Sequence, residues 1–350
     1  MKIEQKQLKN KLNTVFINSP GSSMATVQIW FRAGSALEEK SNLGIAHFLE
    51  HMFFKGTKRR PGAKIAFEVE SFGGEINAFT SFDYTCYYIN TPSSQILKTT
   101  DILMDMVCAP VFKENDLVPE RGVVFEEYRR SLDNPHQFAF KEIQTTSFTG
   151  GYAHPILGTE KTIKNFSRKQ LTDFRNNFYN LSQAFLVVAG DLKEKDKIEK
   201  QIEKYNLPKG PRAKTALFKL KDKATLNIHQ KDVKQATLTL TFSAPSYTSA
   251  QAPAEDLALS VLGYGETSLL HQKLVLEKTL ATAATSSSMF FTQGGVHLIR
   301  IVCPENNLKN IYQELIHVLK EKDNEGFSDQ EVQKIKNQYI ASKVYEKESL

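Results

Sequence analysis

The chain has 350 residues, a length that suggests about two domains, each large enough to bury its own core. Its composition, 41% hydrophobic and 24% charged, is that of an ordinary soluble protein. The 45 basic residues exceed the 39 acidic ones, but the lysines are scattered rather than gathered into one patch, which argues against nucleic-acid binding.

The N-terminal segment alternates in charge and contains no apolar run long enough for a signal peptide or a membrane span. We therefore expect the chain to be cytoplasmic and to have no membrane span. The three cysteines, Cys86, Cys108 and Cys303, are isolated and never form a Cys-x-x-Cys arrangement. We expect them to be buried thiols in a reducing compartment rather than disulfides or metal ligands.

The first predicted elements are two strands, at residues 14–18 and 25–33, which end at a Pro-Gly and a Gly-Ser pair. The segment GIAHFLEHMFFKGT at Gly44–Thr57 then has the spacing of a helix. Ser41 or Asn42 is the expected N-cap of this helix.

This helix carries two rows of side chains. The apolar row supplies the stripe that a core-facing helix needs, and it consists of Ile45, Phe48, Leu49, Met52 and Phe53. His47, Glu50 and His51 lie three and four residues apart and point the same way. Two imidazoles one turn apart can chelate a metal ion, and a carboxylate between them can work on a metal-bound water. The alternative is a chance pair of ordinary histidines, and a metal site needs a third ligand.

The next elements alternate between helices and a hairpin. A helix at about 62–72 precedes residues 75–92, whose β-branched and aromatic side chains predict a hairpin. Helices are predicted again at about 93–109 and at 115–132. In the second of these, Pro119 is tolerable only in the first turn.

One row of the 115–132 helix contains two acids. Glu120, Val123, Val124 and Glu127 follow the i, i+3, i+4, i+7 spacing of a single helix face. Acids on the same stripe as two valines are predicted to point inward, where an unpaired carboxylate is costly and a metal ion would explain it. The alternative is a solvated glutamate-rich face, which fits the neighbouring Glu126 better than it fits the two acids of the row.

Farther along the chain, residues 168–178 are a predicted helix and residues 184–190 a predicted strand. His136 and His154 each lie beside a proline in loop-like sequence, and we interpret both as structural. Residues 206–215 contain two prolines and several charges and are the best linker candidate.

The sequence repeats itself after this linker. Residues 25–35 and 236–246 share Ala, Thr, Phe, Ala and Ser positions at an offset of 211 (236 − 25), which predicts a duplicated α+β unit. At that offset the His/Glu/His row falls on Ala258, Val261 and Leu262. Only the first copy would then carry the metal-binding and catalytic residues.

Together these segments resemble the M16 metallopeptidases, the family of pitrilysin, insulin-degrading enzyme and mitochondrial processing peptidase, whose inverted zinc motif is His-x-x-Glu-His. AHFLEHMFFKGT, GGEINAFTSFDYTCYY, ERGVVFEEY and LVVAGDL carry the similarity in the family's order, and it is closest to short bacterial and mitochondrial-type members.

The resemblance implies an α+β fold of two related domains from an internal duplication. Each domain would be an antiparallel-rich sheet with helices packed on it, and the pair would form half of a clamshell. We expect a zinc-binding catalytic domain at residues 1–210 and a second domain at 216–350. The second would lack the metal motif and would be cut short at its C-terminus relative to the family.

The resemblance also implies a site for one Zn²⁺ per chain. His47, His51 and Glu127 would be the ligands, since the family's third ligand is a glutamate about 76 residues beyond the second histidine, and 127 − 51 is 76. Glu50 would be the general base, and Glu120 the nearby acid that helps to organise the site.

Substrate binding is expected at a strand edge. The family's peptide substrates add themselves to an exposed strand, which here corresponds to Asn77, Ala78, Phe79 and Thr80. The alternative for this segment is an ordinary hairpin strand.

Two departures from the family bear on activity. Members that complete their own site carry an arginine and a tyrosine in the second domain, whereas this sequence places Leu269 and Thr282 at those positions. The transition-state oxygen would lack its usual side-chain donors. The chain also ends at Leu350, on a predicted helix in the middle of the second domain, as a fragment of a longer protein or one half of an obligate pair would. We expect a dimer, either of this chain with itself or a heterodimer with a related subunit that carries the Arg/Tyr pair.

The leading hypothesis is a zinc-dependent endopeptidase subunit that acts on peptides or small unfolded proteins. The alternative is a non-catalytic subunit of the same family that serves assembly or peptide binding. Such subunits usually lose the motif residues, which this chain retains. A metal-storage protein would be expected to have Cys/His clusters, which the sequence lacks.

Overall fold

The computed structural model describes residues 1–214, 218–221 and 225–348, and the chain divides into two compact units. The first unit comprises Met1–Thr146 and Gly150–Ala216, and the second comprises Ser147–Thr149 and Leu217–Leu350. Each unit has its own sheet and helices, so the predicted α+β class is confirmed. No helix among the described residues is both long enough and apolar enough to cross a membrane.

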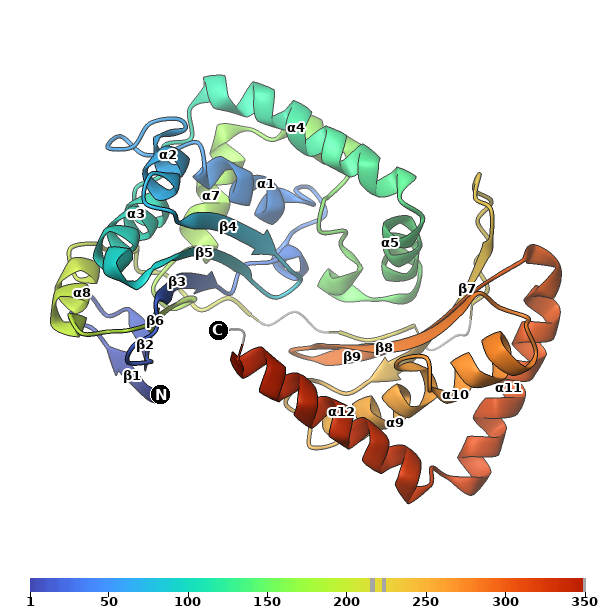
Figure 1. Ribbon diagram of the computed structural model, residues 1–350. Helices are drawn as coiled ribbons and strands as arrows, with labels where there is room; N and C mark the ends of the chain where they lie inside the picture. The colour runs from blue at the N-terminus through green and yellow to red at the C-terminus, as the bar shows by residue number, and fades with distance from the viewer. Residues whose placement is uncertain (215–217, 222–224, 349–350) are drawn as a thin grey trace. The chain divides into compact units, whose positions relative to one another are not determined.

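The first unit contains a six-stranded sheet in the order β1-β2-β6-β3-β5-β4 (Figure 1). Its strands are β1 (Lys2–Gln7), β2 (Asn13–Asn18), β3 (Met24–Phe31), β4 (Glu75–Thr80), β5 (Thr85–Pro92) and β6 (Ala184–Gly190). All neighbouring pairs are antiparallel except β2 and β6. The predicted hairpin is therefore confirmed as β4 and β5, and it places β4 at one edge of the sheet.

Eight α-helices are described in the first unit: α1 (Ile45–Phe53), α2 (Lys64–Glu70), α3 (Ile96–Cys108), α4 (Glu114–Asp133), α5 (Pro135–Ser147), α6 (Glu160–Asn165), α7 (Arg168–Phe178) and α8 (Lys195–Ile202). Figure 1 shows α1 between the sheet and the long helix α4, and α1 contacts both β4 and α4. The apolar row of α1 is buried, with Phe48, Leu49 and Met52 at 0% exposure. This packing fixes which face of α1 is left for the polar row.

Two expectations about helices were wrong. Pro119 lies in the second turn of α4, and the helix continues through it. The carbonyl left without its partner belongs to Asn115, which is exposed, so water can satisfy it. The region around His136, predicted to be loop-like, is the first turn of α5. There Asn134 Oδ1 accepts hydrogen bonds from the backbone N–H groups of His136 and Gln137, and Pro135 takes the first helical position.

The second unit repeats the element order of the first. Its sheet has the order β7-β9-β8, built from β7 (Ala236–Ala244), β8 (Ala283–Phe291) and β9 (Gly294–Cys303). Its helices are α9 (Ala252–Gly263), α10 (Leu269–His271), a π-helical turn (Gln272–Glu277), α11 (Leu308–Glu325) and α12 (Asp329–Glu348). The succession of strand, helix, hairpin and two helices matches β3, α1, β4, β5, α3 and α4. The recurrence agrees with the predicted duplication.

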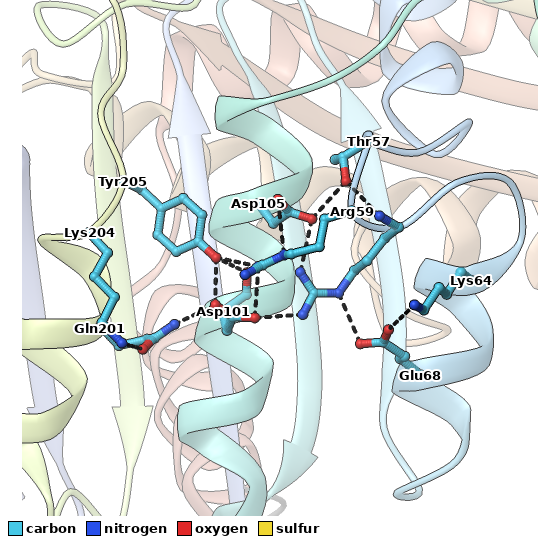
Figure 2. Close-up of polar contacts among 10 residues, drawn as sticks. Thr57, Arg59, Lys64, Glu68, Asp101, Asp105, Gln201, Lys204 and Tyr205 are labelled. Atoms are coloured by element: carbon cyan, nitrogen blue, oxygen red, sulfur yellow. Dashed lines mark hydrogen bonds and ion pairs between the residues drawn. The ribbon is translucent and has the colours of Figure 1, made fainter.

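A buried ion-pair network holds the turn that follows α1. Figure 2 shows Asp101 and Asp105 projecting from α3 towards this turn. The guanidinium of Arg60 pairs with three carboxylates, those of Glu68, Asp101 and Asp105, at N–O separations of 2.9, 2.5 and 2.9 Å. Thr57 donates to Asp105 Oδ2 at 2.8 Å and accepts from the backbone N–H of Arg60 at 2.9 Å. The network therefore ties the turn to α3.

Replacing Arg60 by methionine is expected to lower the free energy of unfolding by about 3–5 kcal/mol, because Asp105 would be left buried without its main cation. Arg59→Met is the matched control. Its side chain is 51% exposed, so its ion pairs should contribute under about 1 kcal/mol. Denaturant unfolding of both variants checks this expectation, and equal losses would contradict it.

Candidate metal centre

The helix that carries the histidines begins at Ile45, and its N-cap is Gly44 rather than Ser41 or Asn42 as predicted. Gly44 has a φ of +86°, and a side chain there would lie 2.6 Å from the Cα of Gly158. The first turn is capped from a distance by Glu38. Its Oε2 accepts from the backbone N–H of Gly44 at 2.7 Å, and its Oε1 accepts from that of Ala46 at 2.9 Å. A buried carboxylate therefore fixes the start of the metal-site helix.

Glu38 should give the stability a distinctive pH dependence. Burial raises the pKa of Glu38 to about 8, although its two backbone hydrogen bonds oppose the shift. Between about pH 5 and 8 the folded chain holds a proton that the unfolded chain has released. The contribution of Glu38 to the free energy of unfolding should thus fall by roughly 1.4 kcal/mol per pH unit across this window.

The measurement is the free energy of unfolding from pH 5 to 8 for the unmodified chain, Glu38→Gln and Glu39→Gln. Glu38→Gln should lose this slope, whereas Glu39→Gln should keep it because Glu39 is exposed. Parallel curves for all three proteins would show that Glu38 does not titrate in this window.

The three predicted ligands lie together in the first unit. His47 and His51 come from α1 and Glu127 from α4, and one donor atom of each lies within 4.8 Å of the other two. His47 Nε2 is 3.6 Å from Glu127 Oε1, and His51 Nε2 is 3.4 Å from Glu127 Oε2. The imidazoles of His47 and His51 beside it hold the pKa of Glu127 well below its usual range.

This donor set fits a zinc ion. Zinc binds nitrogen and oxygen ligands at about 2.0–2.2 Å, so two ligand atoms on a tetrahedral ion are about 3.4 Å apart. The separations between Glu127 and the two imidazoles, 3.6 and 3.4 Å, match this spacing. Two imidazoles and one carboxylate are also a three-ligand set of the kind found in catalytic zinc sites, which keep a further position open.

Glu120 lies behind His51 rather than among the three ligands. Its Oε1 is 2.8 Å from Nδ1 of His51, while its Oε2 is paired with the ammonium of Lys55. Burial would raise the pKa of Glu120, but the bonds from His51 and Lys55 outweigh it and lower the pKa. Glu120 therefore remains an anion placed to orient the ring of His51.

The two acids of the row on α4 were predicted to point inward on a stripe shared with two valines, and the structure departs from this at Val123 and in part at Glu127. Glu120 and Val124 are buried, but Val123 is 48% exposed, and the side chain of Glu127 is 39% exposed. The buried stripe of α4 also includes Leu117, and Val123 lies about a quarter turn of the helix away from its centre. Glu127 is therefore at the rim of the buried surface, where its carboxylate can reach the imidazoles.

Glu50 lies between the histidines and contacts the edge strand. Its Oε2 accepts a hydrogen bond from Thr80 Oγ1 at 2.5 Å, and Thr80 is the last residue of β4. Burial raises the pKa of Glu50, against the opposing effect of His47. A carboxylate with a raised pKa and a fixed orientation is suited to accept and return a proton.

The four predicted substrate-binding residues form the C-terminal part of β4, which pairs with β5 and with no other described strand. Ala78 donates its backbone N–H to the side chain of its neighbour Asn77 at 2.8 Å. Phe79 is 40% exposed. The strand thus offers a free edge next to Glu50.

At the repeated positions the second unit has Ala258, Val261 and Leu262, whose side chains cannot bind a metal. Leu269 and Thr282 stand where the resemblance implies an arginine and a tyrosine. Leu269 opens α10 and packs partly against the core, while Thr282 donates to Gln235 Oε1 at 3.1 Å. Neither residue can supply the charge of an arginine or the phenol of a tyrosine.

Three functional features were missed from the sequence. These are the cap supplied by Glu38, the hydroxyl of Thr80 on Glu50, and the ion pair of Lys55 with Glu120. Lys55 follows His51 by four residues, so helical spacing could have placed it beside the histidines. The other two depend on contacts between separate elements.

Comparisons with known proteins agree with this description. Residues 13–160 match the family model described as insulinase (peptidase family M16), and residues 165–339 match that of the peptidase M16 inactive domain. The chain is 31% identical over 319 residues to an uncharacterized zinc protease of Rickettsia bellii (strain RML369-C), covering 90% of this chain and 76% of that protein. It is 35% identical over 193 residues to the mitochondrial-processing peptidase subunit beta of Rattus norvegicus, covering 55% and 39%.

Among solved structures, a protease from Helicobacter pylori superposes with a TM-score of 0.91 at 27% sequence identity, covering 98% of this chain and 85% of that one. A peptidase M16 inactive domain from Pseudomonas fluorescens superposes with a TM-score of 0.84 at 17% identity, covering 98% and 84%. The second likeness concerns the fold alone.

Proposed function

Because the chain belongs to the M16 family of peptidases, we propose that it is a zinc-dependent endopeptidase that hydrolyses peptides or small unfolded proteins. The observation that carries this proposal is the meeting of His47, His51 and Glu127, with the buried carboxylate of Glu50 beside them. Relatives named as zinc proteases support the same assignment.

In this proposal His47, His51 and Glu127 hold the ion. Zinc in such a site supplies Lewis acidity, which lowers the pKa of water and polarises a peptide carbonyl. Glu50 takes a proton from the attacking water and returns it to the leaving amine. Thr80 keeps its carboxylate pointed at the site through the 2.5 Å hydrogen bond.

The edge of β4 would hold the substrate. An extended peptide can pair with the main chain of Asn77–Thr80 as an added strand, which gives affinity with little dependence on sequence. Because Thr80 both ends this strand and bonds Glu50, a peptide bound there would lie directly beside the general base. The side chain of Asn77 must release the N–H of Ala78 to allow full pairing.

The purified chain should contain about one zinc per molecule but hydrolyse a fluorogenic peptide only feebly, and a chelator should abolish the hydrolysis of the assembly in which the chain is active. Metal analysis of the chain and the peptide assay of that assembly test this expectation. A chain that takes up no zinc, or an active assembly that does not respond to chelator and added zinc, would contradict the proposal.

The second unit supports a dependence on a partner. With Leu269 and Thr282 at the expected Arg and Tyr positions, the oxyanion lacks two donors, and each missing donor typically costs about a hundred- to a thousandfold in rate. We infer that a related subunit carrying the Arg/Tyr pair completes the site as a heterodimer. One relative is named as a subunit. We expect the related subunit to co-purify with this chain and to raise its activity strongly. Robust hydrolysis by the chain as a monomer would refute the partner, and zinc binding without hydrolysis in any assembly would favour the non-catalytic alternative.

A further inference from the structure

Lys55 lies one helical turn beyond His51, at the end of the segment that carries the metal-site histidines. Its ammonium pairs with Oε2 of Glu120, while the other oxygen of that carboxylate is 2.8 Å from Nδ1 of His51. The side chain of Glu120 is only 4% exposed, and that of Lys55 is 34% exposed. A single buried carboxylate therefore links a partly exposed cation to the back of one ligand imidazole.

The two ligand histidines differ in this respect. His51 has Glu120 behind it, whereas Nδ1 of His47 is buried and has no hydrogen-bond partner among the described residues. The orientation of the two imidazoles thus depends on the contact between Glu120 and His51. A carboxylate behind a ligand histidine fixes the ring and raises its basicity, and losing such a partner typically costs 10- to 100-fold in metal affinity.

Glu120 needs a cation to fill this role. Glu50, Glu120 and Glu127 bring three carboxyl groups around two imidazoles, and among the ion pairs of the described residues Lys55 alone brings a lysine or arginine to any of them. A nearly buried carboxylate is costly without a cation, and it gains by turning towards solvent when that cation is removed. Its hold on the ring of His51 would then be looser.

The backbone of Lys55 is held in place by the turn described above. Its N–H donates to the carbonyl of Met52 at 3.2 Å, and its own carbonyl accepts from the N–H of Gly62 at 3.2 Å. Gly56 has a φ of +102°, and a side chain there would lie 2.3 Å from the carbonyl oxygen of Arg60. The network of Figure 2 anchors this turn to α3. The ammonium therefore reaches Glu120 from a fixed base.

We propose that Lys55 is a positioning residue that holds Glu120 against His51 and thereby sets the metal affinity of the site. This inference rests on the proposed function, since it takes the metal to be zinc. Among the ion pairs of the described residues, Lys55 is joined to Glu120 and not to His47, His51, Glu50 or Glu127, so its effect passes through Glu120.

The test compares Lys55→Met, Lys55→Arg and Lys58→Met with the unmodified full chain. Methionine keeps much of the length of lysine without its charge, arginine keeps the charge, and Lys58 is an exposed lysine of the same turn. Metal-free protein is titrated with zinc against a competing chelator. It is also titrated with Co²⁺, whose visible absorption reports the geometry around the ligands. Thermal unfolding of the metal-free variants reports folding.

Lys55→Met should bind zinc about 10- to 100-fold more weakly and change the Co²⁺ spectrum, whereas Lys55→Arg should recover most of the affinity and Lys58→Met should match the unmodified chain. In a Glu120→Gln background, Lys55→Met should have no further effect, because the carboxylate through which it acts is gone. Comparing Glu120→Gln with the double variant Glu120→Gln/Lys55→Met also tests the role of Lys55 if Lys55→Met alone folds poorly.

Unchanged zinc affinity and an unchanged Co²⁺ spectrum in Lys55→Met would overturn the role of Lys55 and leave the proposed function standing. Equal losses in the presence and absence of Glu120 would overturn it as well. Failure of the unmodified chain to bind zinc would overturn the proposed function itself.

Discussion

Glu50→Gln is expected to keep about one zinc per chain and to lose peptide hydrolysis by about a hundred- to ten-thousandfold, the usual contribution of a general base. Glutamine has nearly the shape of glutamate and can still accept the hydrogen bond from Thr80, but it cannot take a proton from water. Since Glu50 is not among the three predicted ligands, the metal should remain.

The measurement is kcat for a fluorogenic peptide, made together with metal analysis of the same preparation and in the assembly that gives activity. Glu126→Gln is the matched control, because Glu126 is an exposed glutamate on α4 with a side chain 60% exposed. Retained activity in Glu50→Gln would assign the proton transfer to another group.

His51→Ala and Glu127→Gln are each expected to lower the zinc content from about one per chain to well below it after dialysis. Each variant removes one of only three protein ligands. In His51→Ala the anion of Glu120 also loses its hydrogen bond to the ring, so the loss should be at least as large as in Glu127→Gln.

Metal analysis after exhaustive dialysis checks the ligand assignment, and far-UV circular dichroism shows whether each variant is folded. Glu126→Gln again serves as the control, since it neighbours Glu127 in sequence but lies on the exposed side of α4. Unchanged zinc content in both ligand variants would place the metal elsewhere.

Local signals predicted much of the fold. The helix α7 and the strand β6 have the predicted bounds, residues 168–178 and 184–190. The start of α7 is well defined because it has a complete capping box, in which the side chains of Ser167 and Gln170 accept from each other's backbone N–H groups. The helix α5 was missed, although Asn134 and Pro135 form an N-cap and first helical position that could have been recognised.

Features that depend on distant contacts could not be read in this way. The first turn of α1 is capped by the carboxyl group of Glu38, six and eight residues upstream of the groups it bonds, and no short-range rule for caps extends that far. The edge position of β4 follows from the order of the whole sheet, which long-range pairing decides.

The same contrast between local signals and long-range contacts applies to the candidate site. The shared face of His47 and His51 follows from helix geometry, and the structure places both imidazoles at Glu127. The spacing of Glu127 from the histidines was supplied by the family resemblance, because an offset of 76 residues carries no local constraint. Which of Glu127 and Glu120 joins the three ligands, and which lies behind His51, depends on how α4 is rotated about its axis. A sequence pattern does not give that rotation. The same rotation leaves Val123 exposed, contrary to the prediction.

The position of β6 in the sheet affects how the first unit folds during synthesis. This strand, residues 184–190, is the last of the six in sequence, yet it lies between β2 and β3 and pairs with both. Until it leaves the ribosome, the nascent chain can form only two separate pieces, β1 with β2 and β3 with β5 and β4. Each piece has an open inner edge lined by apolar residues, the kind of edge that promotes aggregation. Closure over so long a separation is intrinsically slow. The histidines of α1 are thus synthesised long before the sheet beneath them can close.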